Sequence, residues 1–290
     1  MTQSSRILKY IQTLKKRYLV LAKEKQALID LINETEVAEQ VYNSNAIENS
    51  TLSLDETEKI LLQIDLDRYI NERELFEAKN LARVVNYINQ KATEKGLSLD
   101  TILLLHKMLI SNIRDDIAGR FRNNDEWVRV GNHIAPDPKF VLELLNEMLL
   151  TYQINDTQNI VDKIAKLHLT FEHIHPFVDG NGRIGRVINN YALIRENYVP
   201  INIKFINRKE YYEAFVEFDK TGTTKIMSEI IGKALCQSYH KRLAYLEGKK
   251  IISLSDYAKQ EKISHSNLLN KANRQTIAAF LEKGFWKIGI

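Results

Sequence analysis

Apolar residues recur at helical spacing along most of this 290-residue chain. The pattern predicts helical structure over residues 5–34, either as one helix or as two helices interrupted at Lys25. It predicts further helices over residues 71–92, 99–111, 157–173, 183–197, 208–219 and 224–246. Ser98 suits the N-cap of the helix at 99–111, and Asn207 with Glu210 matches a capping box before the helix at 208–219. The sequence therefore predicts a mainly helical protein.

Two stretches depart from this pattern. Between Gly119 and Pro138, strand-forming residues precede a Gly131-Asn132 turn, which predicts a β-hairpin. Gly248-Lys249-Lys250 marks a boundary, and residues 248–290 combine two short helices with a terminal strand, which resembles a small winged helix-turn-helix. Such modules bind DNA or pack against protein, and the sequence leaves both open. We expect an N-terminal helical region at 1–97, a core at 98–247 and a winged-helix-like module at 248–290.

Net charge, cysteine content and hydropathy limit the partners and the compartment that we expect for this protein. The formal net charge of +4 is too weak to argue for nucleic acid by itself. The single cysteine, Cys236, excludes an intramolecular disulfide and fits a reducing cytoplasm. The first residues contain no long apolar run, so they read as neither signal peptide nor membrane anchor. We therefore expect a cytoplasmic protein without a membrane partner.

The stretch HPFVDGNGRIGR at residues 175–186 contains the strongest candidate site. Gly180 and Gly182 allow a tight turn that brings backbone N–H groups close to an anion. Residues 183–197 continue with helical spacing, so the turn precedes a helix N-terminus, where phosphate is favoured. The backbone pattern alone therefore predicts a phosphate site.

The side chains of the same stretch extend this prediction. Arg183 and Arg186 are three residues apart on the expected helix, so both can reach the same phosphates. Asp179 offers the hard oxygen ligands that Mg²⁺ prefers. His175 is the group suited to accept a proton near neutral pH. Together these residues suit the handling of a nucleoside triphosphate.

The pattern HPF-x-D-GNGR-x-x-R resembles the signature of the Fic (filamentation induced by cAMP) family at every fixed position. The resemblance implies transfer of AMP from ATP to a target protein, with His175 deprotonating the Ser, Thr or Tyr hydroxyl and Asp179 holding Mg²⁺. It implies that ATP and its phosphates are bound by Asp179, Gly180, Asn181, Gly182, Arg183, Ile184, Gly185 and Arg186. The related Doc branch, which phosphorylates its target, has lysine where Gly182 stands, so GNG favours AMP transfer.

An upstream segment, Ser44-Asn45-Ala46-Ile47-Glu48-Asn49, resembles the family's inhibitory motif (S/T)xxxE(G/N). Ser44 and Glu48 are four apart and share one helical face. The resemblance implies that Ser44, Glu48 and Asn49 are inhibitory and that Glu48 pairs with Arg186, which displaces the γ-phosphate from its productive pose. In some family members this glutamate also supports removal of AMP, and the sequence leaves that role of Glu48 open.

The resemblance assigns two further sets of residues. The hairpin would be the family's flap, which clamps the target segment by strand pairing and places Val130, Gly131, Asn132 and His133 over the nucleotide. The adenosine would be contacted by Tyr211, Tyr212 and Asp219, although the family often has asparagine at the last position.

Other readings of the chain remain open. The enzyme could remove AMP or work in both directions, or the chain could be a DNA-binding regulator with a nucleotide-sensing Fic domain. Self-association that buries the inhibitory helix is a further implication of the resemblance. His168, His173 and His175 lack an HExxH arrangement and a partner cysteine, so no zinc site is expected among these three.

Overall fold

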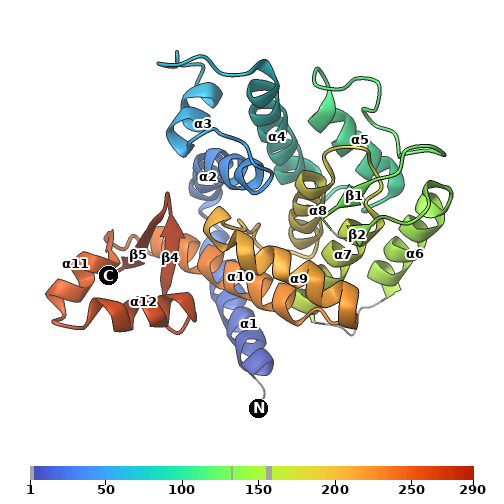
Figure 1. The fold of residues 1–290 in the computed structure, drawn as a ribbon. Helices are drawn as coiled ribbons and strands as arrows, with labels where there is room; N and C mark the ends of the chain where they lie inside the picture. The colour runs from blue at the N-terminus through green and yellow to red at the C-terminus, as the bar shows by residue number, and fades with distance from the viewer. Residues whose placement is uncertain (1–2, 132, 155–158) are drawn as a thin grey trace. The chain divides into compact units, whose positions relative to one another are not determined.

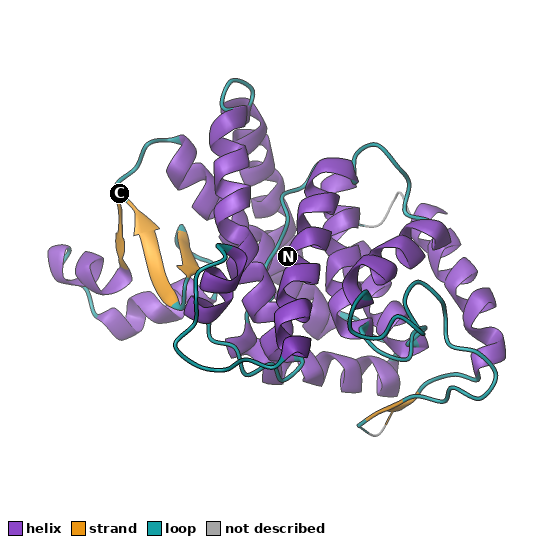
Figure 2. Ribbon diagram, turned by 90° about the horizontal axis from the view of Figure 1, so that it is seen from above, coloured by secondary structure: helices purple, strands orange, loops and turns teal. Residues whose placement is uncertain are grey.

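The computed structural model describes residues 3–131, 133–154 and 159–290, and it confirms a mainly helical fold (Figure 1). Strands occur only as a short hairpin and a small C-terminal sheet within these described ranges (Figure 2). The chain divides into two compact units. The larger comprises Val37–Tyr198 and Ile203–Ser228, and the smaller comprises Met1–Glu36, Val199–Asn202 and Glu229–Ile290.

Two long helices begin the chain. α1 (Gln3–Ala22) and α2 (Gln26–Ile47) are separated by a short break at residues 23–25, so the interruption expected at Lys25 divides the N-terminal pattern into two helices. The last part of α2, from Val37 onward, belongs to the larger unit. The predicted inhibitory motif at residues 44–49 therefore lies within the larger unit, at and just beyond the C-terminal end of α2.

The larger unit is built around a buried helix. Its remaining elements are α3 (Leu54–Leu61), α4 (Glu72–Lys91), α5 (Leu99–Ile110), β1 (Arg129–Val130), β2 (His133–Ile134), η1 (Pro138–Phe140), α6 (Val141–Ile154), α7 (Ile160–Ile174), α8 (Asn181–Arg195), η2 (Phe205–Asn207), α9 (Arg208–Thr221) and the first turn of α10 (Lys225–Leu246). α4, α5 and α7 all pack against α8. Nearly every residue of α8 is buried, including Ile184 and Ile188, which are fully shielded from solvent. The N-terminus of α8 is therefore fixed in the core of this unit.

Helix caps test the local predictions. Ser98 caps α5 by accepting a hydrogen bond from the Thr101 N–H, as predicted. The predicted capping box at Asn207 and Glu210 is wrong, because Asn207 makes no side-chain cap and closes the short helix η2 instead. The preceding 3-10 turn leads directly into α9, so no side chain is needed to start that helix.

The smaller unit contains the C-terminal elements: β3 (Ile251–Ser253), α11 (Leu254–Gln260), α12 (His265–Asn273), β4 (Ala279–Glu282) and β5 (Phe285–Gly289). The strands form an antiparallel sheet in the order β3-β5-β4. The two helices and the sheet enclose a small apolar core of Leu254, Ala258, Leu268, Ala272, Ala279 and Ile288. Among the described residues, no helix combines the length and apolar content needed to cross a membrane.

Candidate active site

A cavity of about 1190 Å³ lies in the larger unit and brings the predicted site residues together. Its walls are formed by the end of α2, the start of α4, the hairpin, the loop 175–180, the first turn of α8, and α9. The predicted residues that line it are Glu48, Asn49, Val130, Gly131, His133, His175, Asp179, Gly180, Asn181, Gly182, Arg183, Tyr211, Tyr212 and Asp219. Asn132 lies outside the described residues. Segments far apart in the sequence therefore share one cavity.

The loop between α7 and α8 is fixed by its own residues. His175 ends α7 in a left-handed conformation (φ 49°), which is uncommon for a residue with a Cβ and clusters at functional sites. Gly180 is also left-handed (φ 85°), and a Cβ there would lie 3.0 Å from Cδ1 of Ile110. The Asn181 side chain accepts a hydrogen bond from the Phe177 N–H (2.9 Å) and donates one to the Phe177 carbonyl (2.8 Å). No side chain caps α8, so its first N–H groups can serve an anion.

The imidazole of His175 is oriented as a base. Its Nδ1 lies 3.0 Å from the carbonyl oxygen of Glu172, so Nδ1 carries the proton and donates it to that carbonyl. The lone pair is then on Nε2. Burial lowers the pKa of His175 to about 4, because the imidazolium would lose its hydration. The ring is therefore neutral at pH 7 and can accept a proton at Nε2.

A buried carboxyl group lies next to this histidine. Burial raises the pKa of Glu172 to about 8, although the positive charge of Arg186 opposes the change. Its Oε2 lies 3.8 Å from Nδ1 of His175, and the contact joins two neutral groups at pH 7 rather than an ion pair. Oε1 of Glu172 is buried without a hydrogen-bond partner among the described residues. A Cβ at Gly185 would clash with this oxygen, so the glycine makes room for the carboxyl group.

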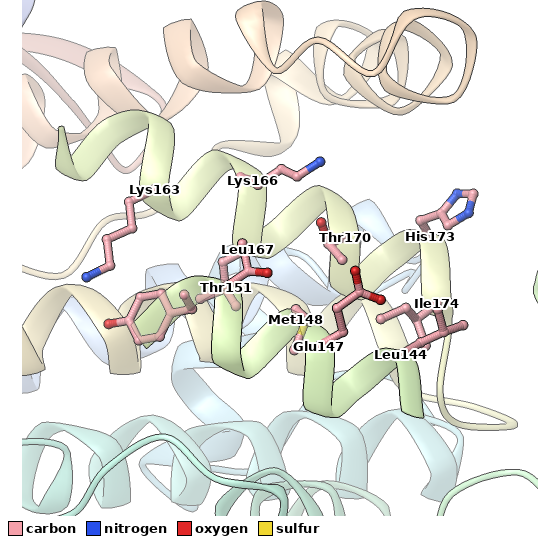
Figure 3. Close-up of a pocket in the computed structure, with 11 residues that line it drawn as sticks. Leu144, Glu147, Met148, Thr151, Lys163, Lys166, Leu167, Thr170, His173 and Ile174 are labelled. Carbon is pink, nitrogen blue, oxygen red and sulfur yellow. The ribbon is translucent and has the colours of Figure 1, made fainter. Parts of the chain in front are cut away.

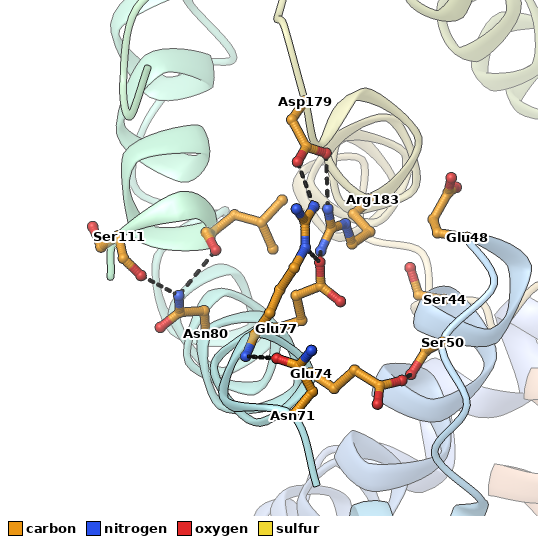
Figure 4. A network of polar contacts seen from close by, with 12 residues as sticks. Ser44, Glu48, Ser50, Asn71, Glu74, Glu77, Asn80, Ser111, Asp179 and Arg183 are labelled. Carbon is orange, nitrogen blue, oxygen red and sulfur yellow. Dashed lines mark hydrogen bonds and ion pairs between the residues drawn. The ribbon is translucent and has the colours of Figure 1, made fainter. Parts of the chain in front are cut away.

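Asp179 is held by two arginines (Figure 4). Arg73 of α4 donates to its Oδ2 at 2.6 Å, and Arg183 of α8 donates to its Oδ1 at 3.2 Å. Both guanidinium groups also lie 3.0 Å from Oε1 of Glu77. Burial alone would raise the pKa of Asp179, but the charges of Arg183 and Arg73 hold it below its usual value. An ionised carboxylate therefore lines the cavity beside the start of α8, as a magnesium ligand should.

The second motif arginine is bound to the segment that is predicted to be inhibitory. Nη2 of Arg186 donates to Oε1 of Glu48 at 2.8 Å and to the Ser44 carbonyl at 2.8 Å, and its Nε donates to Oγ of Ser44 at 2.9 Å. Nη1 donates to the Tyr211 hydroxyl at 3.1 Å. A Cβ at Gly182 would clash with Glu48, so the glycine permits its close approach. Each of the three guanidinium nitrogens of Arg186 thus donates to a protein group.

The predicted hairpin is present, with β1 pairing antiparallel to β2. Val130 and Ile134 are exposed, at 41% and 65% of their surface. Nε2 of His133 donates to the carbonyl of His173 at 2.9 Å, which ties the hairpin to the end of α7. We refer to residues 129–134 as the flap.

A buried arginine joins the segment after the flap to the loop. Arg122 is 2% exposed and donates from Nε to the carbonyl of His175 (2.8 Å) and from Nη2 to that of Ile174 (3.2 Å). It also donates to the carbonyl of Pro136, just beyond the flap. Its own N–H donates to the carbonyl of Pro176 (2.9 Å). These bonds satisfy the carbonyls that α7 leaves without partners where it ends at His175.

The three residues predicted at the adenosine differ in exposure. Tyr211 is buried, and its hydroxyl donates to Nε2 of His168 at 2.8 Å while accepting from the motif arginine described above. Tyr212 is half-buried on the cavity wall. Oδ1 of Asp219 lies 3.0 Å from Nδ1 of His173. Tyr212 and Asp219 thus have surface available to a ligand, while the Tyr211 hydroxyl is committed to protein contacts.

Sequence reasoning missed several residues that organise this site. His106 of α5 stacks on Phe177 with ring centroids 3.6 Å apart, and its Nε2 donates to the carbonyl of Asp179 at 3.0 Å. Its Nδ1 accepts from the Gly119 N–H at 3.0 Å. The full set missed is Arg73, Glu77, His106, Arg122 and Glu172. Arg73, Glu77, His106 and Arg122 stand in no local pattern. Only Glu172, three residues before His175, had a signal in its spacing.

A second, smaller cavity of about 180 Å³ lies between α6 and α7 (Figure 3). Its lining mixes apolar residues with the side chains of Glu147, Lys163 and Lys166. None of its lining residues belongs to the predicted site. The chemistry expected from the motif is therefore confined, among the described residues, to the larger cavity.

Comparisons with known proteins agree with this geometry. Residues 96–193 match the model of the Fic/DOC family. The chain is 32% identical over 218 residues to a protein adenylyltransferase Fic of Drosophila virilis, a match that covers 70% of this chain and 44% of that protein. The chain therefore spans less than half the length of this relative.

Solved structures share the fold. A Fic-domain-containing signaling protein from Bacteroides thetaiotaomicron superposes with a TM-score of 0.73 at 21% identity, over 83% of this chain and 97% of that one. Fic-1 from C. elegans superposes with a TM-score of 0.72 at 24% identity, over 84% and 73% of the two chains. At these identities the likeness concerns the fold alone.

Proposed function

We propose that the chain is a Fic protein that transfers AMP from ATP to a hydroxyl group of a target protein, because residues 96–193 match the Fic/DOC family model and 70% of the chain is similar to a protein adenylyltransferase. The observation that carries the proposal is the state of His175. The ring is neutral, its Nδ1–H is bound to the Glu172 carbonyl, and its Nε2 is available in a cavity that also holds the uncapped start of α8. A base and an anion site thus share one cavity.

The reaction follows from these positions. Nε2 of His175 accepts the proton of the target hydroxyl as its oxygen attacks the α-phosphorus of ATP. A new P–O bond forms, the bond to pyrophosphate breaks, and pyrophosphate leaves. The N–H groups at the start of α8, from Asn181 and Gly182, bind the phosphate oxygens. Catalysis comes mainly from positioning and from neutralising charge.

Magnesium fits the carboxylate at Asp179. This side chain is ionised, lines the cavity and is balanced by two arginines, Arg73 and Arg183. One carboxylate together with phosphate oxygens is the ligand set that Mg²⁺ usually takes with nucleotides. Bound there, Mg²⁺ would neutralise charge on the phosphates. Arg73 and Arg183, which contact Asp179, are guanidinium groups that would suit phosphate oxygens beside it.

Inhibition is proposed to come from Glu48. Its contact with Arg186 removes a phosphate-binding guanidinium from the cavity, and Ser44 holds the same guanidinium from a second side. The γ-phosphate of ATP would have to compete with both groups. Glu48→Gly should therefore raise activity by freeing Arg186. The same glutamate could support AMP removal by orienting water, and AMP release from a modified target would test that direction.

The test of the main proposal uses α-labelled ATP and Mg²⁺ with three proteins: wild type, Glu48→Gly, and Glu48→Gly/His175→Ala. We expect one AMP adduct by intact mass in Glu48→Gly, little in wild type and none in the double variant. ATP binding, measured separately, should survive in the double variant. Absence of label in every protein, with ATP bound and candidate targets supplied, would reject AMP transfer.

A second function, DNA binding, is supported by α12. Its exposed face presents Asn267, Asn270, Lys271 and Arg274 at helical spacing, which are residue types that reach base edges and phosphates. Residues 248–290 carry eight Lys and Arg against three Asp and Glu. Mobility shifts of the full chain and of Lys271→Ala/Arg274→Ala at low salt would test this function. The absence of any shift by the wild-type chain would remove it.

A further inference from the structure

Three metal-ligand side chains from separate elements converge on the cavity wall. They are His133 of the flap, His173 at the end of α7 and Asp219 of α9. Their potential ligand atoms all lie within 4.8 Å of one another. The three residues are 40 and 46 positions apart along the chain, so their meeting is a product of the fold. Neither the base, the phosphate site nor the inhibitory contact uses this group, although the family resemblance also places His133 over the nucleotide and Asp219 at the adenosine.

The distances suit a small tetrahedral ion. Nδ1 of His173 lies 3.0 Å from Oδ1 of Asp219, and Nδ1 of His133 lies 3.5 Å from Oδ2 of the same carboxylate. Zinc binds imidazole nitrogen and carboxylate oxygen at about 2.0–2.2 Å, and two ligands on a tetrahedron of that size stand about 3.4 Å apart. Each histidine therefore has one oxygen of the Asp219 carboxylate near the ligand spacing of a zinc site. The remaining pair can close because the side chain of His173 is 44% exposed.

The ring of His133 is already oriented for coordination. Its Nε2 donates to the carbonyl of His173, which fixes the tautomer and leaves the lone pair on Nδ1, toward Asp219. Metal-bound histidines commonly have their second nitrogen hydrogen-bonded in this way, which orients the ring and raises its basicity. The cluster thus contains a hydrogen bond that orients one imidazole as well as three side chains that could bind a metal.

From this geometry we infer that His133, His173 and Asp219 bind one Zn²⁺ ion. Two imidazoles and one carboxylate favour zinc over Mg²⁺ and Ca²⁺, which prefer oxygen ligands. The side chains of all three residues are partly exposed, at 19%, 44% and 34%, so solvent can enter and water can complete the coordination. The site is distinct from the magnesium site at Asp179 and goes beyond the proposed function.

Such an ion would link the flap to α9. At present the flap is joined to the end of α7 through the hydrogen bond of His133, and a metal would add bonds to Asp219. All three ligands line the same cavity as His175, so zinc would fix one wall of that cavity. The Arg129 peptide bond in β1 then becomes less accessible to trypsin, because cleavage requires the hairpin to open locally.

The test measures zinc binding by the full chain, produced without a polyhistidine tag. We expect one Zn²⁺ per chain by equilibrium dialysis and metal analysis, with at least about tenfold weaker binding in His173→Ala and in Asp219→Asn. His265→Ala, at an exposed histidine on α12, should bind as wild type does. The visible spectrum of bound Co²⁺ should report tetrahedral coordination in wild type and lose that signature in the two ligand variants.

Two further readouts keep the test decisive. The melting temperature without metal shows whether each variant folds, and zinc should raise it in wild type and in His265→Ala only. Zinc should also slow tryptic cleavage after Arg129. Equal zinc affinity in wild type and both ligand variants, or no stoichiometric binding at all, would overturn the site. None of these measurements depends on ATP or on turnover, so failure here leaves AMP transfer untouched.

Discussion

Residues 175–181, which comprise the loop and the first residue of α8, and the flap at residues 129–134 border the same cavity but are built in opposite ways. In the loop, Phe177 is fully buried and Asn181 is 3% exposed, and backbone groups are bonded to Arg122 and Asn181. The flap has two-residue strands and exposed side chains, and its link to the end of α7 is the hydrogen bond of His133.

The difference follows from what each region has to do. A proton acceptor must be placed within a few tenths of an ångström, because rate falls steeply with misalignment. A segment that pairs with an incoming target strand must keep a free edge. The backbone polar groups of the loop are therefore hydrogen-bonded within the protein, whereas the flap keeps polar groups available for an incoming strand. Changes in the loop should be costly and changes in the flap mild, which can be tested with matched substitutions.

The largest expected effect is loss of the base. In a Glu48→Gly background, His175→Ala should lower the rate of AMP transfer by about 10²–10⁴-fold, because it removes the proton acceptor at the start of the loop that leads into α8. The matched change in the flap, His133→Ala, should lower it less than about tenfold without added zinc. Rates come from single-turnover labelling, and calorimetry should show ATP binding retained in both. Equal losses at the two histidines would contradict the division between loop and flap.

The next largest effect is on the free energy of unfolding and comes from the buried carboxyl group of Glu172. A carboxyl whose pKa is raised by folding binds its proton more tightly in the folded state, so it lowers stability as pH rises from 4.5 toward 8. Moving the pKa of Glu172 from 4.5 to about 8 corresponds to at most about 5 kcal/mol. Glu172→Gln removes this titration, so the variant should gain stability relative to wild type between about pH 5 and pH 8.

Urea unfolding at both pH values measures this gain. The matched control is Glu56→Gln in α3, where hydrogen bonds from Arg68 lower the pKa to about 2. The stability from Glu56 is lost only as pH falls below about 4.5 toward 2, so its difference from wild type should stay constant between pH 5 and 8. A pH-independent difference for Glu172→Gln as well would mean that Glu172 is ionised in the folded state.

The same contrast explains what the sequence could predict. The loop and the start of α8 are contiguous in sequence. The turn, the helix start and the charged side chains all lie within residues 175–186, so they could be predicted together. The hairpin was readable from its strand formers and its turn. The contact between Glu48 and Arg186 spans 138 positions and was reachable only through the resemblance of its motif.

Residues that contact the loop from distant segments of the chain could not be predicted from the sequence around them. Arg122 and His106 bind the loop from segments with ordinary local sequence, because a single buried polar residue is defined by its partners rather than its neighbours. The histidines at 168, 173 and 175 are close in sequence but point to different partners: Tyr211, Asp219 and the Glu172 carbonyl. The metal-ligand group instead combines His173 with His133 from another element.

A smaller effect is expected at the arginine that secures the loop. Arg122→Lys keeps the charge but loses the forked hydrogen bonds to the carbonyls of His175 and Ile174, so it should cost about 1–3 kcal/mol of stability. Arg129→Lys in the flap removes one exposed hydrogen bond to the Gly131 carbonyl and should cost no more than about 0.5 kcal/mol. Urea midpoints of the two variants compare the regions directly, and similar costs would show that the flap is as tightly held as the loop.

The smallest expected effect is in the pH profile of the base. Burial lowers the pKa of His175 to about 4, so the ring stays unprotonated as pH falls from about 7.5 to about 5.5. In Glu48→Gly, kcat/KM should then change less than about twofold over this range, since the free enzyme's base is already in its active form. Glu48 raises the pKa of His175, so its removal keeps that pKa low. An exposed histidine with a pKa of about 6.5 would instead lose about tenfold in activity. A tenfold decline would show that the loop is more hydrated than its buried contacts indicate, and the contrast with the flap would weaken at the residue where it matters most.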